Sequence, residues 1–80
     1  MQELTELLTS LVSPLTDQPD QMSITVDEPD AGGVITFHLH VAPEDMGRVI
    51  GKQGRIAKAI RVVMRAAATR RDMKISVDID

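Results

Sequence analysis

The sequence predicts an α+β fold in which a three-stranded mixed sheet is packed by helices. Three observations support this prediction: two segments with helical spacing of apolar residues, three segments that alternate apolar and polar residues, and a glycine-rich loop between helical patterns. At 80 residues the chain has room for one hydrophobic core, so we expect a single domain over residues 1–80. Phe37 is the only aromatic residue, so this core must be almost entirely aliphatic.

The N-terminal half predicts one helix and a β-hairpin. Leucines recur at helical spacing through residues 2–12, and Pro14 ends that helix. A polar connection follows. Strands are expected at about 22–27 and 34–41, because both runs alternate and the segment between them is rich in turn-forming residues.

The C-terminal half predicts a short helix opened by Pro43, a glycine loop, a long helix at about 55–69 and a last strand at about 73–79. The connection from Val41 to Met73 is long enough for a crossover, so we expect the last strand to run parallel to a neighbour in a mixed sheet. The spacing predicts that one face of the long helix packs on the core, namely Ile56, Ala59, Ile60, Val63 and Ala67.

Charge is distributed unevenly along the chain. The formal net charge is −3, but all nine Lys and Arg residues lie within residues 48–74, where Asp72 is the one acid, which gives 9 − 1 = +8. Residues 1–47 hold nine acids and no Lys or Arg. Arg55, Lys58, Arg61 and Arg65 fall on an arc roughly 120° wide on the long helix. A polyanion responds to such a local field, although a basic, solvated helix face would have the same composition.

The loop Gly51-Lys52-Gln53-Gly54 is the most informative segment. Glycines at both ends allow a tight turn and allow a sugar-phosphate backbone to approach the main chain. The next helix begins directly after the loop, so unpaired N–H groups and the positive end of the helix dipole face the bound strand. Lys52 adds a positive charge and Gln53 an amide. The loop therefore predicts phosphate binding.

The run from Ile50 through the loop to Ile60 resembles the GXXG signature of KH domains, whose loop clamps about four nucleotides. The element order is similar to that of the type II KH fold. The length and the Arg-rich helix resemble the small bacterial single-KH-domain proteins of the KhpA family. Ala57 departs from the pattern, since many KH domains have a large aliphatic residue there.

The resemblance implies a single-stranded RNA-binding protein that acts as an RNA chaperone or post-transcriptional regulator. It assigns Gly51 and Gly54 to backbone approach, Lys52 and Gln53 to phosphate contact, and Ile50 to support of the groove. Weaker assignments are Arg48, Arg55 and Lys58. It also implies a homodimer and a heterodimer with a larger KH-containing protein. No cofactor and no membrane partner is implied.

Other phosphate or metal sites have less support. The segment Gly47 to Lys52 approximates a P-loop, but its spacing is one residue short and Gln53 replaces the Ser or Thr that binds magnesium. His38 and His40 lie on one strand face without a third ligand nearby, which favours solvated or helix-covered histidines over a metal site.

The sequence offers no constellation of nucleophile, acid/base pair or metal ligands, so we do not expect an enzyme. The absence of cysteine and of a secretion signal favours a cytoplasmic location. The remaining alternative is a protein-interaction or dimerisation module, in which the long helix with Ala66-Ala67-Ala68 forms an interface and the basic face binds an acidic partner. This alternative is compatible with RNA binding.

Overall fold

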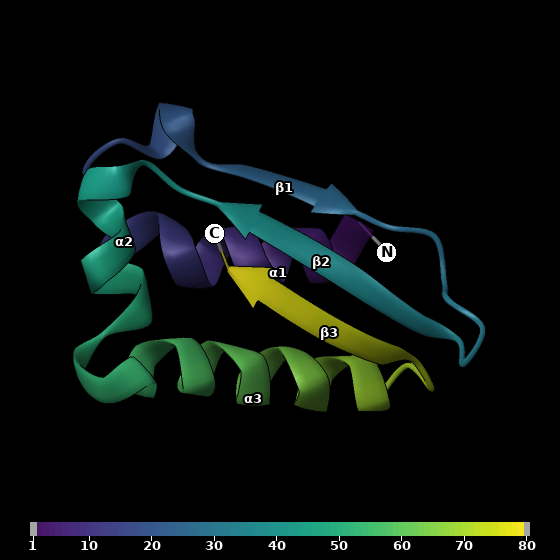
Figure 1. The fold of residues 1–80 in the computed structure, drawn as a ribbon. Helices are drawn as coiled ribbons and strands as arrows, with labels where there is room; N and C mark the ends of the chain where they lie inside the picture. The colour runs from purple at the N-terminus through teal and green to yellow at the C-terminus, as the bar shows by residue number, and fades with distance from the viewer. Residues whose placement is uncertain (1, 80) are drawn as a thin grey trace.

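A computed structural model describes residues 2–79, so the two ends of the predicted domain, Met1 and Asp80, lie outside the described residues. The elements follow the predicted order (Figure 1). The helices are α1 (Gln2–Val12), α2 (Pro43–Ile50) and α3 (Arg55–Thr69), and the strands are β1 (Ser23–Val26), β2 (Val34–His40) and β3 (Lys74–Ile79). Each strand is slightly shorter than the alternating pattern that predicted it, because pairing ends before the pattern does.

The three strands form one mixed sheet with β2 in the centre. β1 pairs antiparallel with β2, and β3 pairs with β2 in parallel. The predicted hairpin and the predicted crossover are both confirmed. Figure 1 shows α1 behind the sheet, α3 along β3, and α2 at the end where the chain crosses over. The loop between α2 and α3 therefore lies at one end of the molecule, far from the β1–β2 loop.

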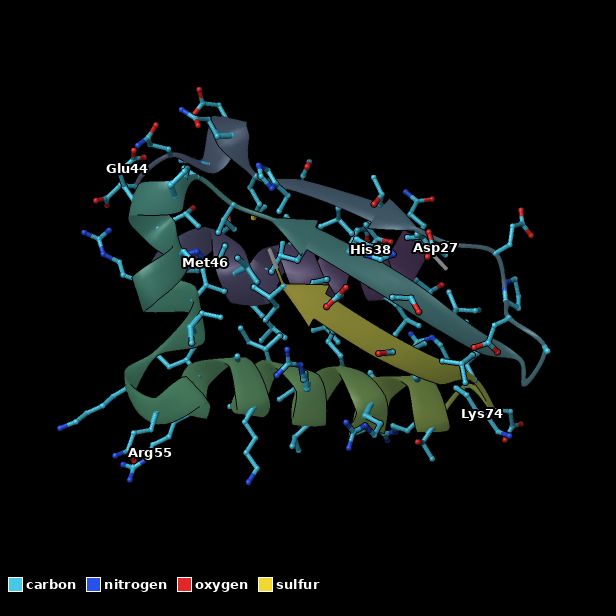
Figure 2. The ribbon with its side chains drawn as sticks, in the orientation of Figure 1. Asp27, His38, Glu44, Met46, Arg55 and Lys74 are labelled. Carbon is cyan, nitrogen blue, oxygen red and sulfur yellow. The ribbon has the colours of Figure 1, made fainter. Side chains whose placement is uncertain are left out.

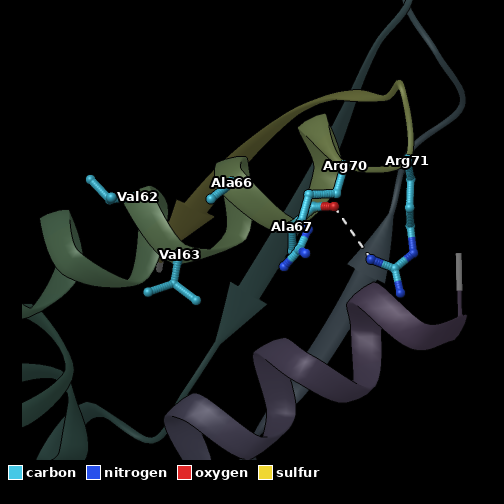
Figure 3. Close-up of a pocket in the computed structure, with 6 residues that line it drawn as sticks. All are labelled: Val62, Val63, Ala66, Ala67, Arg70 and Arg71. Atoms are coloured by element: carbon cyan, nitrogen blue, oxygen red, sulfur yellow. Dashed lines mark hydrogen bonds between the residues drawn. The ribbon is translucent and has the colours of Figure 1, made fainter.

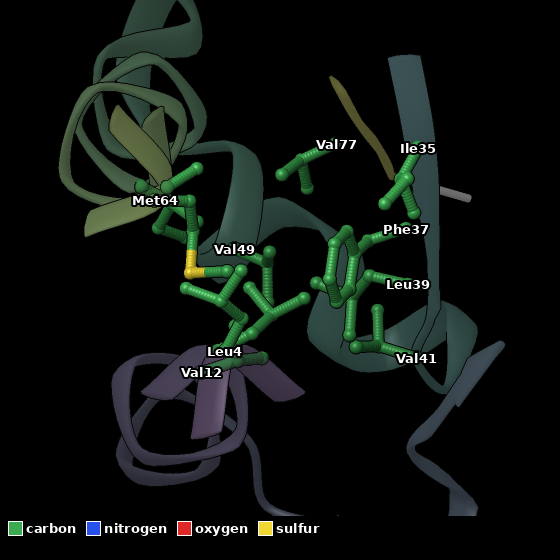
Figure 4. Close-up of a cluster of buried hydrophobic side chains, with 12 residues drawn as sticks. Leu4, Val12, Ile35, Phe37, Leu39, Val41, Val49, Met64 and Val77 are labelled. Carbon is green, nitrogen blue, oxygen red and sulfur yellow. The ribbon is translucent and has the colours of Figure 1, made fainter. Parts of the chain in front are cut away.

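The core lies between the helices and one face of the sheet (Figure 4). Alternate residues of β2 point inward, because successive side chains of a strand lie on opposite faces. Phe37, the single aromatic side chain, is fully buried between them. Aliphatic side chains of the helices and of β3 complete the core: Leu4, Leu8 and Val12 from α1, Val49 from α2, Ile60 and Met64 from α3, and Val77 from β3.

The predicted core face of α3 is wrong in part. The buried residues are Ala57, Ile60, Met64 and Ala68. Ile56 and Val63, which the spacing assigned to the core, are 37% and 42% exposed. The helix carries two adjacent apolar stripes, and it is rotated by roughly 90° about its axis from the predicted orientation. The stripe with small Ala57 and Ala68 faces the sheet, because small side chains allow closer packing. The second stripe is left on the surface.

Asp45 of α2 forms hydrogen bonds with the connection between α1 and β1. This connection contains two short 3-10 turns, Ser13–Leu15 and Pro19–Gln21. The backbone N–H groups of Asp17 and Gln18 donate to the two carboxylate oxygens of Asp45, at 2.9 and 3.1 Å. The Asp45 side chain is only 1% exposed. A buried carboxylate is stable here because both oxygens accept hydrogen bonds.

Replacing Asp45 by alanine is expected to lower the free energy of unfolding by about 2–4 kcal/mol, because two backbone amides lose a charged acceptor. Urea denaturation followed by circular dichroism measures this difference. Glu44→Ala is the matched control, since Glu44 is exposed and binds only the side-chain amide of Gln18 in the connection. Equal stabilities of the two variants would contradict the role of Asp45.

Within residues 2–79, none of the helices has the length and apolar character needed to span a bilayer.

Candidate nucleic-acid interface

The loop between α2 and α3 has an unusual backbone. Gly51, Gln53 and Gly54 have φ angles of 76°, 57° and 74°. The left-handed region is unfavourable for residues with a Cβ atom, so Gln53 is held in a strained conformation by its neighbours. The loop forms one 3-10 turn over Lys52–Gly54, in which the Gly54 N–H donates to the Gly51 carbonyl at 3.2 Å. This turn projects the two central side chains away from the core.

The two loop glycines are needed for different reasons. A Cβ atom on Gly51 would lie 2.5 Å from Cγ1 and 2.8 Å from Cβ of Ile56, which is a collision. A Cβ atom on Gly54 would have no neighbour within 4 Å. Gly51 therefore allows α3 to pack against the loop. Gly54 has a left-handed backbone and leaves open the space through which a ligand would approach.

The polar groups of the loop point into solvent. Lys52, Gln53 and Arg55 are all exposed, and the Arg55 guanidinium donates to Oε1 of Gln53 at 3.4 Å. Figure 2 shows Arg55 extending from the start of α3 into open space. The N-cap residue of α3 is Gly54, which has no side chain to accept from the first-turn amides. The Arg55 amide donates to the Lys52 carbonyl, so the remaining first-turn amides and the helix dipole favour an anion at this end of α3.

A basic row continues along α3 on the side that faces β3. Arg61 donates from Nε to the backbone carbonyl of Val77 at 3.1 Å. β3 is an edge strand, so this bond joins the row to the free edge of the sheet. Lys58 and Arg65, both exposed, flank Arg61 on the same side of the helix. The spacing predicted that Arg61 belongs to the basic arc. Its contact with β3 could not be predicted, because it depends on the crossover that brings β3 beside α3.

Arg48 lies differently from the other predicted site residues. Its guanidinium donates to the carboxylate of Asp17 at 2.6 Å and lies 3.8 Å from Asp45. The hydrogen bond with Asp17 and the attraction of its charge raise the pKa of Arg48 above the ordinary value. The acids in the connection were visible in the sequence, but their proximity to Arg48 was not. Ile50 is half-buried beside the loop, next to fully buried Val49.

Arg71, beyond the far end of α3, is also paired. It donates to Oε2 of Glu3 at 2.7 Å, and this hydrogen bond and charge lower the pKa of Glu3. Among the described residues, the cations near the loop without an acidic partner are therefore exposed Lys52, Arg55 and Lys58, with half-buried Arg61 and exposed Arg65 farther along.

The histidines lie on the other face of the sheet. Nε2 of His38 is 2.7 Å from Asp27, which directly follows β1 (Figure 2). Its Nδ1 is 3.6 Å from Asp78 of β3. His40 is exposed at the end of β2. Between residues 2 and 79, no group of three or more potential ligands has the arrangement needed to hold a metal ion.

Comparisons with known proteins agree with this geometry. A family model described as the KhpA/KhpB KH domain matches residues 5–79. The chain is 51% identical over 74 residues to the RNA-binding protein KhpA of Listeria monocytogenes, an alignment that covers 92% of this chain and 95% of the relative. It is 47% identical over 79 residues to the RNA-binding protein KhpA of Clostridium perfringens, covering 99% of each chain.

The matched region includes every helix and strand, the loop and the basic row, although α1 begins before it. The fold is accordingly the α+β, type II KH fold that the element order predicted. This chain belongs to the KhpA/KhpB family of KH domains.

Proposed function

We propose that this protein binds single-stranded RNA and grips the RNA backbone with the loop Gly51-Lys52-Gln53-Gly54. The observation that carries the proposal is the conformation of this loop, which presents exposed Lys52 and Gln53 beside the uncapped start of α3. The relatives are named RNA-binding proteins, which supports RNA as the ligand. KH loops of this type clamp about four nucleotides.

Each site residue receives a role from its position. Gly51 and Gly54 shape the turn, Lys52 and Gln53 contact phosphates, and Ile50 supports the groove beside them. Arg55 and Lys58 continue the phosphate track along α3. We give Arg48 the smallest share, because RNA would have to compete with Asp17 for its guanidinium.

We further propose that the protein acts as an RNA chaperone or post-transcriptional regulator in the cytoplasm. Binding through phosphates tolerates many sequences, since the backbone carries no base identity. A protein that holds single strands in this way changes the structures and the partners that an RNA can adopt. No chemical step on the RNA is part of the proposal.

Salt dependence tests the phosphate contacts. If two to four phosphates are neutralised per domain, log K is expected to fall against log salt with a slope of roughly −1.4 to −2.8. Fluorescence anisotropy of a short labelled RNA at several salt concentrations measures the slope. A binding constant that does not respond to salt would contradict a phosphate-dominated interface.

We also propose that the protein forms a homodimer through the surface stripe of α3. This stripe, the apolar face, consists of exposed Ile56, Ala59, Val62, Val63 and Ala66. Residues of the apolar face line two open hollows. One of about 710 Å³ lies between Val62 and Arg71 (Figure 3), and one of about 260 Å³ lies between α3 and the end of α1.

A second copy of the chain fits this face better than an acidic protein. The five side chains of the apolar face carry no charge, so they match another uncharged face, and a two-fold contact brings the same patch of each copy together. The small alanines allow close helix approach. The centre of the face lies on the opposite flank of α3 from Arg61, so a docked subunit leaves Arg61 and its contact with β3 uncovered.

Val63→Glu is expected to shift the protein from dimer to monomer, because the substitution would bury a charge at the centre of the contact. Sedimentation equilibrium measures the shift, and circular dichroism verifies the fold. Arg65→Glu, on the other flank, is the control and should remain dimeric. A monomeric wild type that associates only with a larger KH-containing protein would assign the face to that heterodimer instead.

A further inference from the structure

We propose that the apolar face and the RNA loop are energetically coupled through Ile56 and Arg55, so that docking of a second copy tightens RNA binding. This inference rests on the proposed function and assigns a regulation to the same site. It concerns the point where the two surfaces meet, at the first turn of α3. There, two consecutive residues each contact the loop and also line the smaller hollow.

Ile56 is the first of these links. Its side chain lies so close to Gly51 that a Cβ atom on the glycine would be 2.5 Å from Cγ1 of Ile56. The same side chain lines the hollow of about 260 Å³, together with Leu11 and Leu15 from the end of α1 and the turn after it. Ile56 is 37% exposed, so part of its surface is available to a docked subunit. One side chain therefore borders both the hollow and the loop backbone.

Arg55 is the second link. Its guanidinium donates to Oε1 of Gln53 at 3.4 Å, and Arg55 also lines the hollow. Long arginine side chains pack their methylene groups on apolar surface while the charged end stays in water. A subunit that covers the hollow would restrict this side chain. The restriction would hold the guanidinium beside Gln53, where RNA phosphates are proposed to bind.

The expected sign of the coupling is positive. Gln53 has a φ angle of 57°, which a residue with a Cβ atom adopts only when its surroundings hold it there. A docked subunit that fixes Ile56 and Arg55 narrows the set of loop conformations before RNA arrives. RNA then loses less conformational entropy on binding. Because linkage is reciprocal, RNA must strengthen dimerisation by the same factor.

The test compares RNA affinity in the monomer and in the dimer. An RNA of about five nucleotides occupies one loop and excludes a gain from bridging two subunits. We expect this RNA to bind about tenfold more tightly at protein concentrations above the dimer dissociation constant than below it. Dimerisation measured with saturating RNA should strengthen by the same factor.

Substitutions locate the link. Ile56→Ala is expected to bring the affinity ratio between dimer and monomer close to one, and Ile56→Val should give an intermediate ratio, with each ratio measured above and below that variant's own dimer dissociation constant. Val62→Ala is the matched control, because Val62 is 54% exposed on the apolar face but lines only the hollow away from the loop. This variant should retain the full ratio.

The outcomes distinguish the two proposals. Equal RNA affinity of monomer and dimer, with binding still abolished by loop substitutions, would overturn the coupling and leave the proposed function intact. A chain that stays monomeric at every concentration would also overturn the coupling. Failure of the wild-type protein to bind RNA at any concentration would overturn the proposed function itself.

Discussion

Replacing both Lys52 and Gln53 by aspartate is expected to weaken binding of single-stranded RNA by about 100-fold or more. The double substitution changes the loop from one positive charge to two negative charges, directly where phosphates are proposed to lie. Like charges brought together at an interface cost several kcal/mol, and about 2.8 kcal/mol corresponds to 100-fold. Both side chains are exposed, so the free energy of unfolding should remain nearly unchanged. Fluorescence anisotropy and urea denaturation measure the two quantities.

A control with the same change of net charge separates the loop from the overall field of the protein. Lys74→Asp with Gln21→Asp replaces two exposed residues away from the loop, and Figure 2 shows Lys74 at the opposite end of the molecule from Arg55. This variant should lose only a few-fold in affinity, since charges beyond about 10 Å are largely screened at 0.1 M salt. If the folded loop variant bound RNA as well as the control did, the assignment of the loop would be wrong.

Gly51→Ala is expected to lower the free energy of unfolding by about 2–4 kcal/mol and to weaken RNA binding as well. The backbone of Gly51, with φ 76° and ψ 175°, lies in a region that only glycine adopts readily. The added methyl group would also collide with Ile56 at 2.5 Å. Either the loop or the start of α3 must move, which displaces the proposed phosphate contacts. Urea denaturation and RNA titration measure the two effects.

Gly54→Ala provides the internal comparison. Gly54 has φ 74° and ψ 13°, a left-handed conformation that costs a residue with a side chain about 1–2 kcal/mol, and its Cβ atom would meet no protein atom within 4 Å. We therefore expect a smaller loss of stability than for Gly51→Ala. The loss of RNA binding should be large relative to that loss of stability, because the methyl group occupies the open side of the loop. The reverse order of stabilities would contradict the packing described for Gly51.

Most of the fold could be predicted from the sequence because its local signals agree with one another. Residues 2–12 carry a helical pattern that ends at a proline, and residues 34–40 alternate without interruption. The connection between β2 and β3 is long enough for the crossover that a parallel pair requires. The position of the loop could be predicted for the same reason, since two glycines between two helical patterns indicate a tight turn.

The features that could not be predicted depend on which surfaces meet. Two apolar stripes on α3 are equally periodic, and only packing against the sheet decides that Met64 is buried and Val63 is exposed. The buried carboxylate of Asp45 accepts hydrogen bonds from Asp17 and Gln18, which lie almost thirty positions earlier in the sequence. The pairing of Arg48 with Asp17 follows from that arrangement and gives this cation of the predicted site an acidic partner.

α3 has two exposed surfaces, one for the proposed RNA contact and one for the proposed subunit contact. Its basic row faces β3, and its apolar face lies toward α1. The two surfaces meet beside the loop at Arg55 and Ile56. A subunit contact and an RNA strand can therefore occupy the helix together.

A titration of isotope-labelled protein with a short single-stranded RNA, followed through backbone amide signals, tests the central claim most directly. The account predicts that the largest changes occur at the amides from Gly51 to Ile56 and along the basic row at Arg61. Unchanged signals at the loop, with changes gathered instead on the open face of the sheet around Thr36 and His40, would contradict it.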